Sequence, residues 1–556
     1  MSYIFYFIRS FFRLLGNLLR SLRKSPDYVT FVLEGDYTEV KEPKKSFIQR
    51  RMKPDKLSLE ELGGRLEALG NEKKITGVIF HLRPLDMPMS RLQTLRDMMA
   101  GLQQKGKETI VWATNFDTKT YYVACQADRI LLQPGGRIAP LGFVSSTPYM
   151  AAALAKIGLK FEAVQISPYK SAADRLVRTS MSKEVRKMQD WLLDSQYDQL
   201  LDGIVQGRGV DREQAIHMID ESPYTHKEAL ELQLVDQVTG EEDLPRVLAP
   251  GEKPAKLQTW ARSKGKIKPP PLPRPGGYIA MIRIEGSIVD GKSSKPPIPS
   301  PLPIPFIFSQ QAGDQTVVHL ARRALKDPRA KGLLVYIDSG GGSASSSEAM
   351  HAALEKVAAK KPVVALMGSV AASGGYYVAA PAQWIVARPG TITGSIGVLT
   401  GKMVTEKMFS KLSINRQSLS RGTNADMEAG FATFSKKQKE KVWAFVNNIY
   451  ELFLQRVSDS RGLSVEEIDK IGGGRVWTGA QALEHGLVDQ LGGLPESLAK
   501  IYELADLRPN MPLLELTPPK SQAGLQQTPA IAYAAARIKL LQSSEPLCIC
   551  PMEWLR

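Results

Sequence analysis

The stretch Met367-Gly-Ser-Val-Ala-Ala-Ser-Gly-Gly-Tyr-Tyr-Val-Ala379 joins an apolar run to a small-residue turn and a second apolar stretch. An apolar run that ends in a Gly-Gly pair predicts a buried strand that turns into a helix. An earlier stretch, Asn115-Phe-Asp-Thr-Lys-Thr-Tyr-Tyr-Val-Ala124, ends in the same Tyr-Tyr-Val-Ala tetrapeptide. Aligning the two tetrapeptides places Ser373 opposite Thr118, so the chain carries a repeat in which only the second copy has the serine.

The repeat extends over most of the chain. Tyr28-Val-Thr-Phe-Val-Leu-Glu-Gly35 and Tyr278-Ile-Ala-Met-Ile-Arg-Ile-Glu-Gly286 are both apolar strand patterns that end in Glu-Gly. Within each copy, short apolar strands alternate with helical stretches, which is typical of α/β domains with parallel strands. The sequence therefore predicts an α/β fold in two tandem copies, and in the second copy we expect strands at residues 333–337, 363–367 and 384–387.

The composition between the copies sets their boundaries. We assign residues 27–250 to the first repeat and residues 278–505 to the second. Residues 251–277 include the run Pro269-Pro-Pro-Leu-Pro-Arg-Pro275, which can neither continue a helix nor pair in a central strand. We interpret residues 251–277 as a linker.

Further segments lie outside this regular pattern. A second proline run in the second repeat predicts an insertion loop. The tail is expected to hold one short helix, and we assign the tail no function. These segments are the loop at 296–305, the tail at 506–556 with its helix at 530–541, and a membrane-associating segment at 1–26.

Composition limits the classes of function. With 556 residues, 43% of them hydrophobic, the chain is long enough for two domains with sizeable cores. Its three cysteines, Cys125, Cys548 and Cys550, cannot form a disulfide framework and lack the CxxC spacing of a zinc site. We therefore expect no metal and no other cofactor. The net charge of +16 favours an anionic surface, which is either lipid or nucleic acid.

The first residues help to choose between these surfaces. Apolar side chains recur at helical spacing between residues 3 and 22, and the other side carries Arg9, Arg13, Arg20 and Lys24. No uncharged apolar run approaches the roughly 18 residues of a spanning helix, whereas a basic amphipathic helix suits the membrane interface. We expect an in-plane membrane anchor and no nucleic-acid partner. A spanning helix with snorkelling arginines and a helix docked on protein are the alternatives.

Ser373 is a candidate nucleophile because it stands where a strand is expected to turn into a helix. Free amides at such a turn, from Gly374 and from the glycine cluster 340–342, could form an oxyanion hole for acyl transfer. A helix cap is the simpler interpretation of the serine, and phosphate binding is the alternative for the glycines, although the Lys-Ser/Thr ending of a P-loop is missing. Ser395 is a rival hydroxyl that lacks the strand-to-helix context and is expected to play a supporting role.

The general base has to come from elsewhere in the chain. The six histidines are scattered, and His351 lies in an ordinary helical pattern. A lysine can act as the base only when its pKa falls from about 10.4 toward neutrality, and burial in an apolar site produces such a shift. Lys170 in the first repeat is the candidate, and the aligned positions of the second repeat hold Asn424 and Ala425. Each repeat thus keeps one member of a possible pair.

These residues resemble the signal peptide peptidase A (protease IV) family of serine peptidases in its double-length form. The resemblance covers roughly residues 28 to 505 and is most specific in four pieces: the stretch 367–377, Leu334-Val-Tyr-Ile-Asp-Ser-Gly-Gly-Gly342, Thr393-Gly-Ser-Ile-Gly-Val398 and Tyr169-Lys-Ser-Ala172. It implies two tandem ClpP/crotonase-like domains, in which a serine from the second works with a lysine from the first.

The resemblance also implies a role for each matching residue. Ser373 matches the nucleophile, Lys170 the general base and Ser395 the serine that orients the lysine, while Gly374 and Gly341 match the oxyanion donors. The family motif commonly reads Asn-Ser-Pro-Gly-Gly, but this chain has Asp-Ser-Gly-Gly-Gly at 338–342, which leaves the second donor open.

The family forms tetrameric assemblies at the membrane and digests hydrophobic peptides, including released signal peptides. The resemblance thus implies a membrane-associated Ser-Lys endopeptidase, a homotetramer, with hydrophobic peptides and membrane lipids as partners, at the bacterial inner membrane. The membrane face of the site stays open. A catalytically decayed membrane scaffold that binds peptides and an acyl-CoA enzyme on the crotonase fold are the alternatives.

Overall fold

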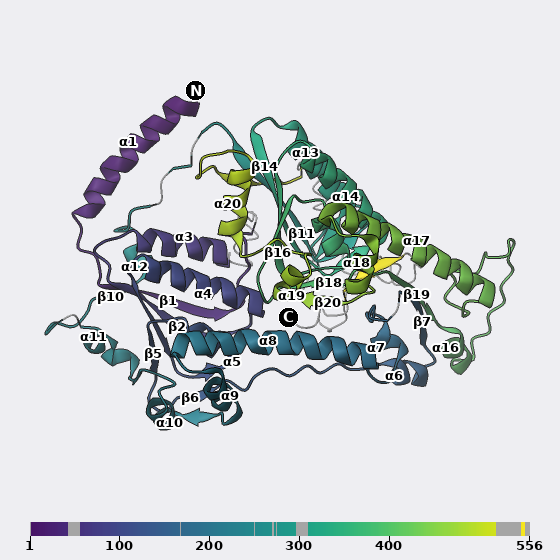
Figure 1. Cartoon of the computed structure of the whole chain (residues 1–556), viewed down its shortest axis with the longest axis horizontal. Coiled ribbons are helices and arrows are strands. Elements are labelled where there is room, and N and C mark those ends of the chain that lie inside the picture. The colour runs from purple at the N-terminus through teal and green to yellow at the C-terminus, as the bar shows by residue number, and fades with distance from the viewer. Residues whose placement is uncertain are drawn as a thin grey trace. The chain divides into compact units, whose positions relative to one another are not determined.

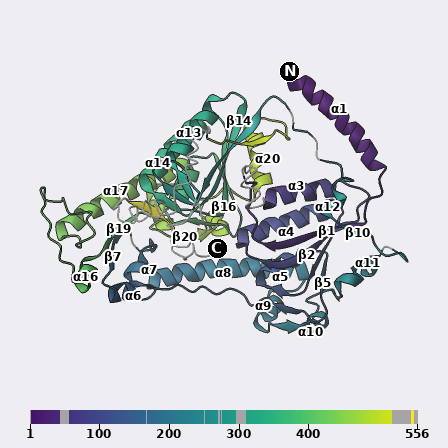
Figure 2. The ribbon, with the colours of Figure 1, turned by 180° about the vertical axis from the view of Figure 1, so that it is seen from behind.

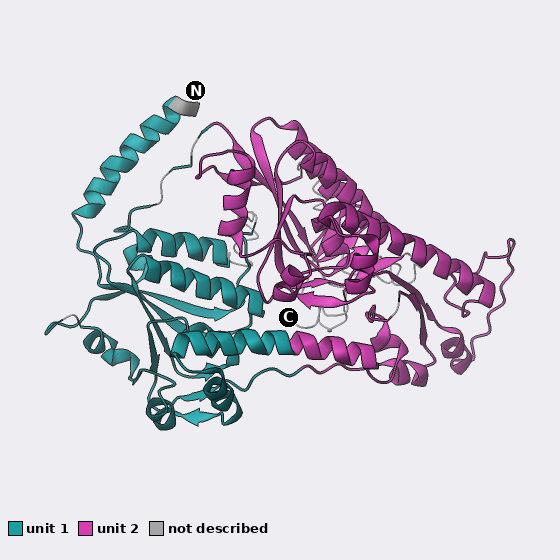
Figure 3. Ribbon diagram, viewed as in Figure 1, with its two compact units in different colours: residues 1–144, 194–275 teal, residues 145–193, 276–556 magenta. Residues whose placement is uncertain are grey.

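The computed structural model describes residues 2–42, 56–166, 168–249, 251–269, 272–273, 275–295, 310–518 and 546–550 (Figure 1). The chain forms two compact units (Figure 3). Unit 1 comprises Met1–Val144 and Asp194–Pro275, and unit 2 comprises Ser145–Leu193 and Gly276–Arg556. The segment Ser145–Leu193 belongs to the first repeat by sequence but packs within unit 2, so the units differ from the repeats at this segment.

Unit 1 is built on a parallel sheet in the order β10-β1-β2-β3-β5-β9. Apolar side chains such as Val78 and Phe80 are fully buried in the core between this sheet and helices α3 and α4. The strands of the sheet are β1 (Tyr28–Gly35), β2 (Gly77–Leu85), β3 (Glu108–Ala113), β5 (Arg129–Leu132), β9 (Gln237–Val238) and β10 (Leu257–Thr259). A smaller sheet holds β4 (Phe116–Asp117), β6 (Arg137–Ala139) and β8 (Tyr224–Thr225).

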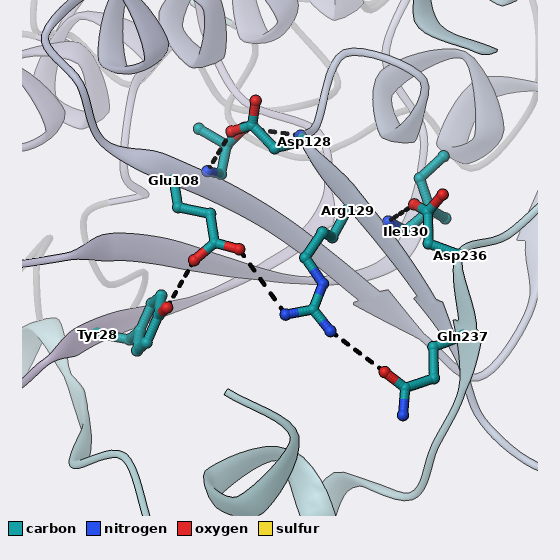
Figure 4. Close-up of polar contacts among 8 residues, drawn as sticks. Tyr28, Glu108, Asp128, Arg129, Ile130, Asp236 and Gln237 are labelled. Carbon is teal, nitrogen blue, oxygen red and sulfur yellow. Dashed lines mark hydrogen bonds and ion pairs between the residues drawn. The ribbon is translucent and has the colours of Figure 1, made fainter. Parts of the chain in front are cut away.

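Polar side chains join the first residues of four strands of the unit 1 sheet (Figure 4). The Tyr28 hydroxyl donates to Glu108 at 2.5 Å, and Arg129 pairs with the same carboxylate at 3.8 Å. Arg129 also donates to the amide oxygen of Gln237 at 3.2 Å. These contacts tie β1, β3, β5 and β9 together where the strands begin.

The helices of unit 1 include the segment that we expected to be an amphipathic helix. They are α1 (Ser2–Ser21), α3 (Leu59–Gly70), α4 (Met89–Gln104), α5 (Thr118–Ala124), α9 (Arg212–Asp220), α10 (His226–Glu231), the 3-10 helix η1 (Glu241–Asp243), α11 (Leu244–Val247) and α12 (Trp260–Ser263). Helix α8 (Lys183–Arg208) begins in unit 2 and ends in unit 1.

Helix α1 keeps a row of large apolar side chains in solvent. Phe7 is 68%, Phe11 64% and Leu18 62% exposed. The predicted helix is therefore confirmed, and its apolar side is open. Among the described helices, none has the length and apolar character needed to cross a bilayer.

The linker is shorter than we predicted. Residues 251–277 contain β10, which pairs with β1 through Tyr28 and Leu257, and the short helix α12. Leu257-Gln-Thr precedes the proline run, so its backbone amides are free to join the sheet edge. The loop expected at 296–305 and the helix expected at 530–541 lie outside the described residues.

Unit 2 contains a larger sheet in the order β20-β18-β16-β14-β11-β22, with β17 and β21 branching from β16. All pairs are parallel except β18 with β20. Each of the ten residues of β16 is buried, as a strand covered on both faces requires. The strands are β11 (Tyr278–Glu285), β14 (Ala330–Ser339), β16 (Val363–Ala372), β17 (Trp384–Ala387), β18 (Ile392–Gly394), β20 (Val476–Thr478), β21 (Gln490–Leu491) and β22 (Leu513–Glu515).

A second sheet of unit 2 has the order β13-β12-β15-β23-β19-β7. Strand β7 comes from the first sequence repeat and pairs antiparallel with β19 over six residues. The members are β7 (Lys160–Gln165), β12 (Ser287–Val289), β13 (Gln311–Gly313), β15 (Gly341–Ser343), β19 (Leu399–Val404) and β23 (Leu547–Ile549).

Helices cover the sheets of unit 2, and α13 packs beside α14, as both views show (Figure 1, Figure 2). The helices are α6 (Ala151–Lys156), α7 (Asp174–Val177), α13 (Asp314–Lys326), α14 (Ala344–Ala358), α15 (Gly374–Ala379), α16 (Glu406–Lys411), α17 (Lys436–Arg461), α18 (Val465–Ile471), α19 (Gly479–Glu484) and α20 (Leu494–Leu504). The predicted α/β class is confirmed in both units.

Candidate active site

Ser373 occupies a one-residue turn between strand β16 and helix α15. Its backbone has φ 55° and ψ −116°, a conformation that a residue with a Cβ rarely adopts. The side chain makes no capping hydrogen bond to the helix, which removes the simpler interpretation of this serine as a cap. The backbone N–H donates to the carbonyl of Gly394 at 2.7 Å, and this bond holds the turn against β18. The hydroxyl is thus left for another partner.

That partner is the amine of Lys170, in the segment between β7 and α7. Lys170 Nζ lies 2.6 Å from Ser373 Oγ. It also donates to the hydroxyl of Ser395 at 3.0 Å and to the carbonyl of Ser395 at 2.9 Å. The structure therefore brings together all three side chains that the sequence pointed to.

Backbone contacts inside unit 2 position the lysine. The N–H of Tyr169 donates to the carbonyl of Gly473 at 3.1 Å. Gly474 adopts φ +87°, and a Cβ built there would come within 2.3 Å of the backbone nitrogen of Lys170, so only glycine fits. The Arg475 guanidinium lies 4.2 Å from the centre of the Tyr169 ring, where a cation interacts favourably with an aromatic face. Residues 473–475 thus pack against Tyr169 and Lys170 and position the lysine, which the sequence did not suggest.

Burial changes the protonation of the lysine. Lys170 is 0% exposed, and desolvation lowers its pKa to about 8 although the neighbouring Cys548 and Cys550 oppose the shift. Lys402 is a second buried lysine of unit 2, but its amine donates to the main-chain carbonyls of Met427 and Ala429. The amine of Lys170 instead contacts two hydroxyls. Its lowered pKa makes the neutral amine accessible near neutral pH.

Ser395 follows strand β18 and, like Ser373, has a positive φ. Its φ is 52°, and its N–H donates to the carbonyl of Arg475 at 2.5 Å. Two non-glycine residues in the left-handed region thus contact one amine. Strained residues of this kind gather at functional sites.

The two glycines predicted as oxyanion donors lie next to each other. A Cβ built on Gly341, whose φ is +100°, would come within 2.6 Å of the Gly374 nitrogen. The N–H of Gly341 donates to the Ser339 hydroxyl at 3.1 Å, and Ser339 donates in turn to the carbonyl of Gly286 at 2.5 Å. The oxyanion roles of both glycines stay predictions, and the amide of Gly341 has an internal partner.

The other candidates of the sequence analysis have different surroundings. His351 is buried on α14 and meets the Tyr377 ring edge-on at 5.5 Å, and burial lowers its pKa. Thr118 begins α5 in unit 1 and donates to the carbonyl of Gly142 at 3.4 Å. Asn424 and Ala425 are exposed in a turn.

Sequence reasoning missed the short strand β23, which lies against this site. The Cys548 side chain is fully buried, and burial raises the pKa of the thiol to about 11 although the nearby Lys170 opposes the shift. The apolar residues around the two cysteines, Leu547-Cys-Ile-Cys550, were a strand signal that we used only to exclude a zinc site.

Comparison with known proteins places the chain in a family. It is 30% identical over 474 residues to "Serine protease SPPA, chloroplastic" of Arabidopsis thaliana, and this match covers 84% of the chain and 68% of the Arabidopsis protein. It is 30% identical over 473 residues to Protease 4 of Salmonella typhi, covering 81% and 72%, and 26% identical over 475 residues to Protease 4 of Haemophilus influenzae, covering 82% and 74%.

The family model makes the assignment and confirms the tandem arrangement. The model of peptidase family S49 matches residues 101–254 and again residues 355–508. Two successive matches agree with the repeat seen in the sequence and with the predicted pair of ClpP/crotonase-like domains. The chain belongs to peptidase family S49.

Proposed function

We propose that this chain is a serine endopeptidase whose catalytic dyad is Ser373 and Lys170. The observation that carries the proposal is the distance of 2.6 Å between the hydroxyl of Ser373, whose backbone is strained, and the amine of the fully buried Lys170. A nucleophile and a base within hydrogen-bond reach, with the base held by a third group, is the arrangement of covalent catalysis. Membership of peptidase family S49 supports peptide-bond hydrolysis as the reaction.

The first step is acylation. The neutral amine of Lys170 accepts the proton of Ser373 as the serine oxygen attacks the carbonyl carbon of the peptide. The N–H of Gly374 stabilises the oxyanion, and the N–H of Gly341 is the second donor if it exchanges Ser339 for the substrate oxygen. The intermediate then expels the amine of the leaving peptide, which takes the proton from the lysine.

The second step returns the free enzyme. A water molecule gives a proton to Lys170 and attacks the ester carbon of the acylated Ser373. The bond to the serine oxygen breaks, and the serine regains the proton from the lysine as the carboxylic acid product leaves. Ser395 keeps the amine in place through both steps.

The substrates that we propose are hydrophobic peptides, including released signal peptides. This follows from the resemblance to signal peptide peptidase A. We also propose that α1 lies in the plane of the bacterial inner membrane and that the protein is a homotetramer. The open apolar side of α1 and its arginines support the membrane proposal, because such a helix gains free energy from apolar burial and from anionic lipids.

A serine-directed fluorophosphonate tests the dyad directly. The purified full-length chain should be labelled on Ser373, as located by mass spectrometry, and should cleave quenched-fluorescence peptides with an apolar core. The Ser373→Ala chain should lose both properties. Labelling of Ser395, or cleavage by the Ser373→Ala chain, would contradict the assignment, and a wild-type chain that is neither labelled nor active would favour the scaffold alternative.

A further inference from the structure

The first repeat has a cavity of about 470 Å³ beside its small sheet. The turn that precedes β6, strand β8 and the start of α10 form its wall. The lining residues are 135–137 and 223–227, and all of them belong to unit 1. Nothing in the proposed peptidase reaction uses these residues.

The second repeat has the same elements in the same register. Arg137 of β6 is the partner of Thr225 in β8. Ile392 of β18 is in the same way the partner of Thr478 in β20. Each threonine then caps the helix that follows it, which is α10 in the first repeat and α19 in the second. The two repeats can therefore be compared residue by residue at this point.

In the second repeat, the start of the helix lies directly against the turn. The N–H of Gly479 donates to the carbonyl of Thr391 at 2.7 Å. The next N–H, that of Ala480, donates to the carbonyl of Pro389 at 3.1 Å. A Cβ built on Gly479 would come within 2.0 Å of the carbonyl oxygen of Arg388, so this close approach requires glycine.

In the first repeat, larger residues occupy the equivalent helix positions. His226 stands where the second repeat has Gly479, and Lys227 stands where it has Ala480. Among the described backbone groups, neither His226 nor Lys227 donates to the turn at 134–136. Because a histidine cannot approach a backbone as closely as glycine does, the helix stands away from the turn and the cavity opens between them.

The same exchanges make the lining basic. Arg137 replaces an isoleucine of the second repeat, His226 a glycine and Lys227 an alanine. In the described part of the chain, none of these three side chains has a hydrogen-bond or ion-pair partner. The adjacent carboxylate, Glu228, accepts from the N–H and the hydroxyl of Thr225, each at 2.8 Å. Three nitrogen-bearing side chains thus border one cavity whose described lining holds no carboxylate.

The chemistry of the lining indicates a class of ligand. A guanidinium and an ammonium both bind oxyanions, and a phosphate monoester with nearly two charges gains most from such a pair. The volume falls within the range of small-molecule sites, about 300–1,000 Å³, and leaves room for more than a phosphate group. Gly135, Gly136, Pro223 and Tyr224 supply apolar surface for the rest of the ligand.

We propose that this cavity binds a small phosphate monoester with an apolar body. Arg137 and Lys227 bind the phosphate, and His226 donates a further hydrogen bond. The apolar body packs against the glycines of the turn and against Tyr224. This binding site goes beyond the proposed peptidase function and does not depend on it.

Calorimetric titration of the purified full-length chain in phosphate-free buffer tests the site, with phenyl phosphate as the probe. It should bind at least about tenfold more tightly than inorganic phosphate, which lacks the apolar body, and than benzoate, which carries one charge. Absence of phenyl phosphate binding would overturn the proposal. Equal affinity for inorganic phosphate or for benzoate would overturn the assignment of a phosphate monoester.

A double variant tests whether the probe uses the predicted cations. The chain with Arg137→Ile and Lys227→Ala carries the residues of the second repeat at both positions, and it should bind phenyl phosphate at least about tenfold more weakly. Lys253→Ala removes an exposed lysine of unit 1 outside the lining and is the matched control, with unchanged affinity. Similar affinities in the two variants would indicate general attraction to a basic chain and would refute the site.

A third variant separates the cavity from its charge. His226→Trp fills the cavity but keeps Arg137 and Lys227, so the affinity for phenyl phosphate should again fall at least about tenfold. A His226→Trp chain that binds the probe like the wild type would place the probe outside the cavity and contradict the proposal. The unfolding temperature of each variant, measured by circular dichroism, should equal that of the wild type.

Discussion

The turn at Ser373 in the second repeat and the turn at Asp117 and Thr118 in the first occupy equivalent positions but are built differently. In the first repeat, Asp117 has φ −95° and caps α5 through a reciprocal pair of bonds with Thr120. In the second, Ser373 has φ 55° and caps nothing. One turn is relaxed and satisfies its helix, whereas the other is strained and presents its hydroxyl to Lys170.

The scaffold behind the two turns is the same. The hydroxyl of Tyr121 donates to the carbonyl of Leu234 at 3.0 Å, and the hydroxyl of Tyr376 donates to the carbonyl of Leu487 at 2.9 Å. The helix that follows each turn is thus pinned by the same bond in both repeats.

An ion pair also recurs in both repeats. Asp236 accepts from the N–H of Ile130 at 2.6 Å and pairs with Arg208, while Asp489 accepts from the N–H of Ile385 at 2.7 Å and pairs with Arg461. The first residues of β5 and β17 differ: Arg129 of β5 donates to Gln237 (Figure 4), whereas Trp384 of β17 donates to Gln490 at 3.1 Å. The two repeats have therefore kept their packing and diverged where chemistry is proposed.

The largest test of this contrast removes the base. Lys170→Ala should lower kcat/KM by at least about 10⁴-fold, because the serine loses the group that accepts its proton. The Thr118→Ser exchange in the Ser373→Ala chain should restore nothing, since the first turn lacks both the strained backbone and the lysine. Steady-state cleavage of the quenched peptide measures both, and any restored activity would break the comparison.

The pH profile is the next largest effect. Burial lowers the pKa of Lys170 to about 8, so the neutral form that can accept a proton is fully populated only above that pH. We expect kcat/KM to rise with pH through a midpoint near 8, with a value at pH 6 roughly 100-fold below the plateau. A flat profile between pH 6 and 9 would exclude Lys170 as the base.

The same shift has a consequence for stability. The pKa of Lys170 is lower in the folded chain than its usual 10.5, so the unfolded chain binds more protons between about pH 8 and 10.5. The free energy of unfolding should therefore rise with pH across this window, and the Lys170→Met chain should not show that contribution. Urea unfolding of the two chains at pH 8 and 10 measures the difference.

Ser395 should contribute less than the dyad. Ser395→Ala removes one of the two bonds from this residue to Lys170 Nζ, and a lost hydrogen bond of about 1 kcal/mol corresponds to a roughly fivefold to tenfold decrease in kcat. The hydroxyl accepts from the charged amine, so its loss should also move the pH midpoint downward. An unchanged midpoint would mean that Ser395 acts only by packing.

The smallest effects concern the backbone of the two turns. Asp117→Ala should cost about 1 kcal/mol of stability in α5, because the cap is lost. Ser373→Gly should instead stabilise the second turn by about 1 kcal/mol, since glycine adopts its backbone angles without strain. Hydrogen exchange of the amides in α5 and α15 measures both values, and a stabilising Asp117→Ala would reverse the comparison.

Regular strands were the most predictable part of the fold. The structure has β1 at the residues expected from alternating and apolar patterns, and β17 matches its prediction as well. Strand β16 runs five residues beyond the expected 363–367, because Gly368-Ser-Val-Ala-Ala372 is small enough to continue between covered faces. Strand β10 was missed because three residues beside a proline run carry almost no periodic signal.

The site was less accessible to physical reasoning from the sequence. Lys170 and Ser373 are 203 residues apart, so no local pattern could join them, and their pairing came from the repeat and from the family resemblance. Gly473 and Gly474, which position the lysine, act through their backbone and leave little trace in side-chain chemistry. The pairing of β23 with β15, which brings Cys548 beside the site, is one that no sequence period encodes.

The β7–β19 ladder limits how this gene could be divided. Six residues of each strand, from Lys160 to Gln165 and from Leu399 to Val404, pair within unit 2. A polypeptide that starts at Gly276 would retain Ser373 but lose β7 with Lys170, and the bare edge of β19 would invite association with other chains. Recombination at the proline run would therefore separate the serine of the second repeat from the lysine of the first. A circularly permuted chain would have to carry residues 145–193 together with the second repeat to keep unit 2 complete.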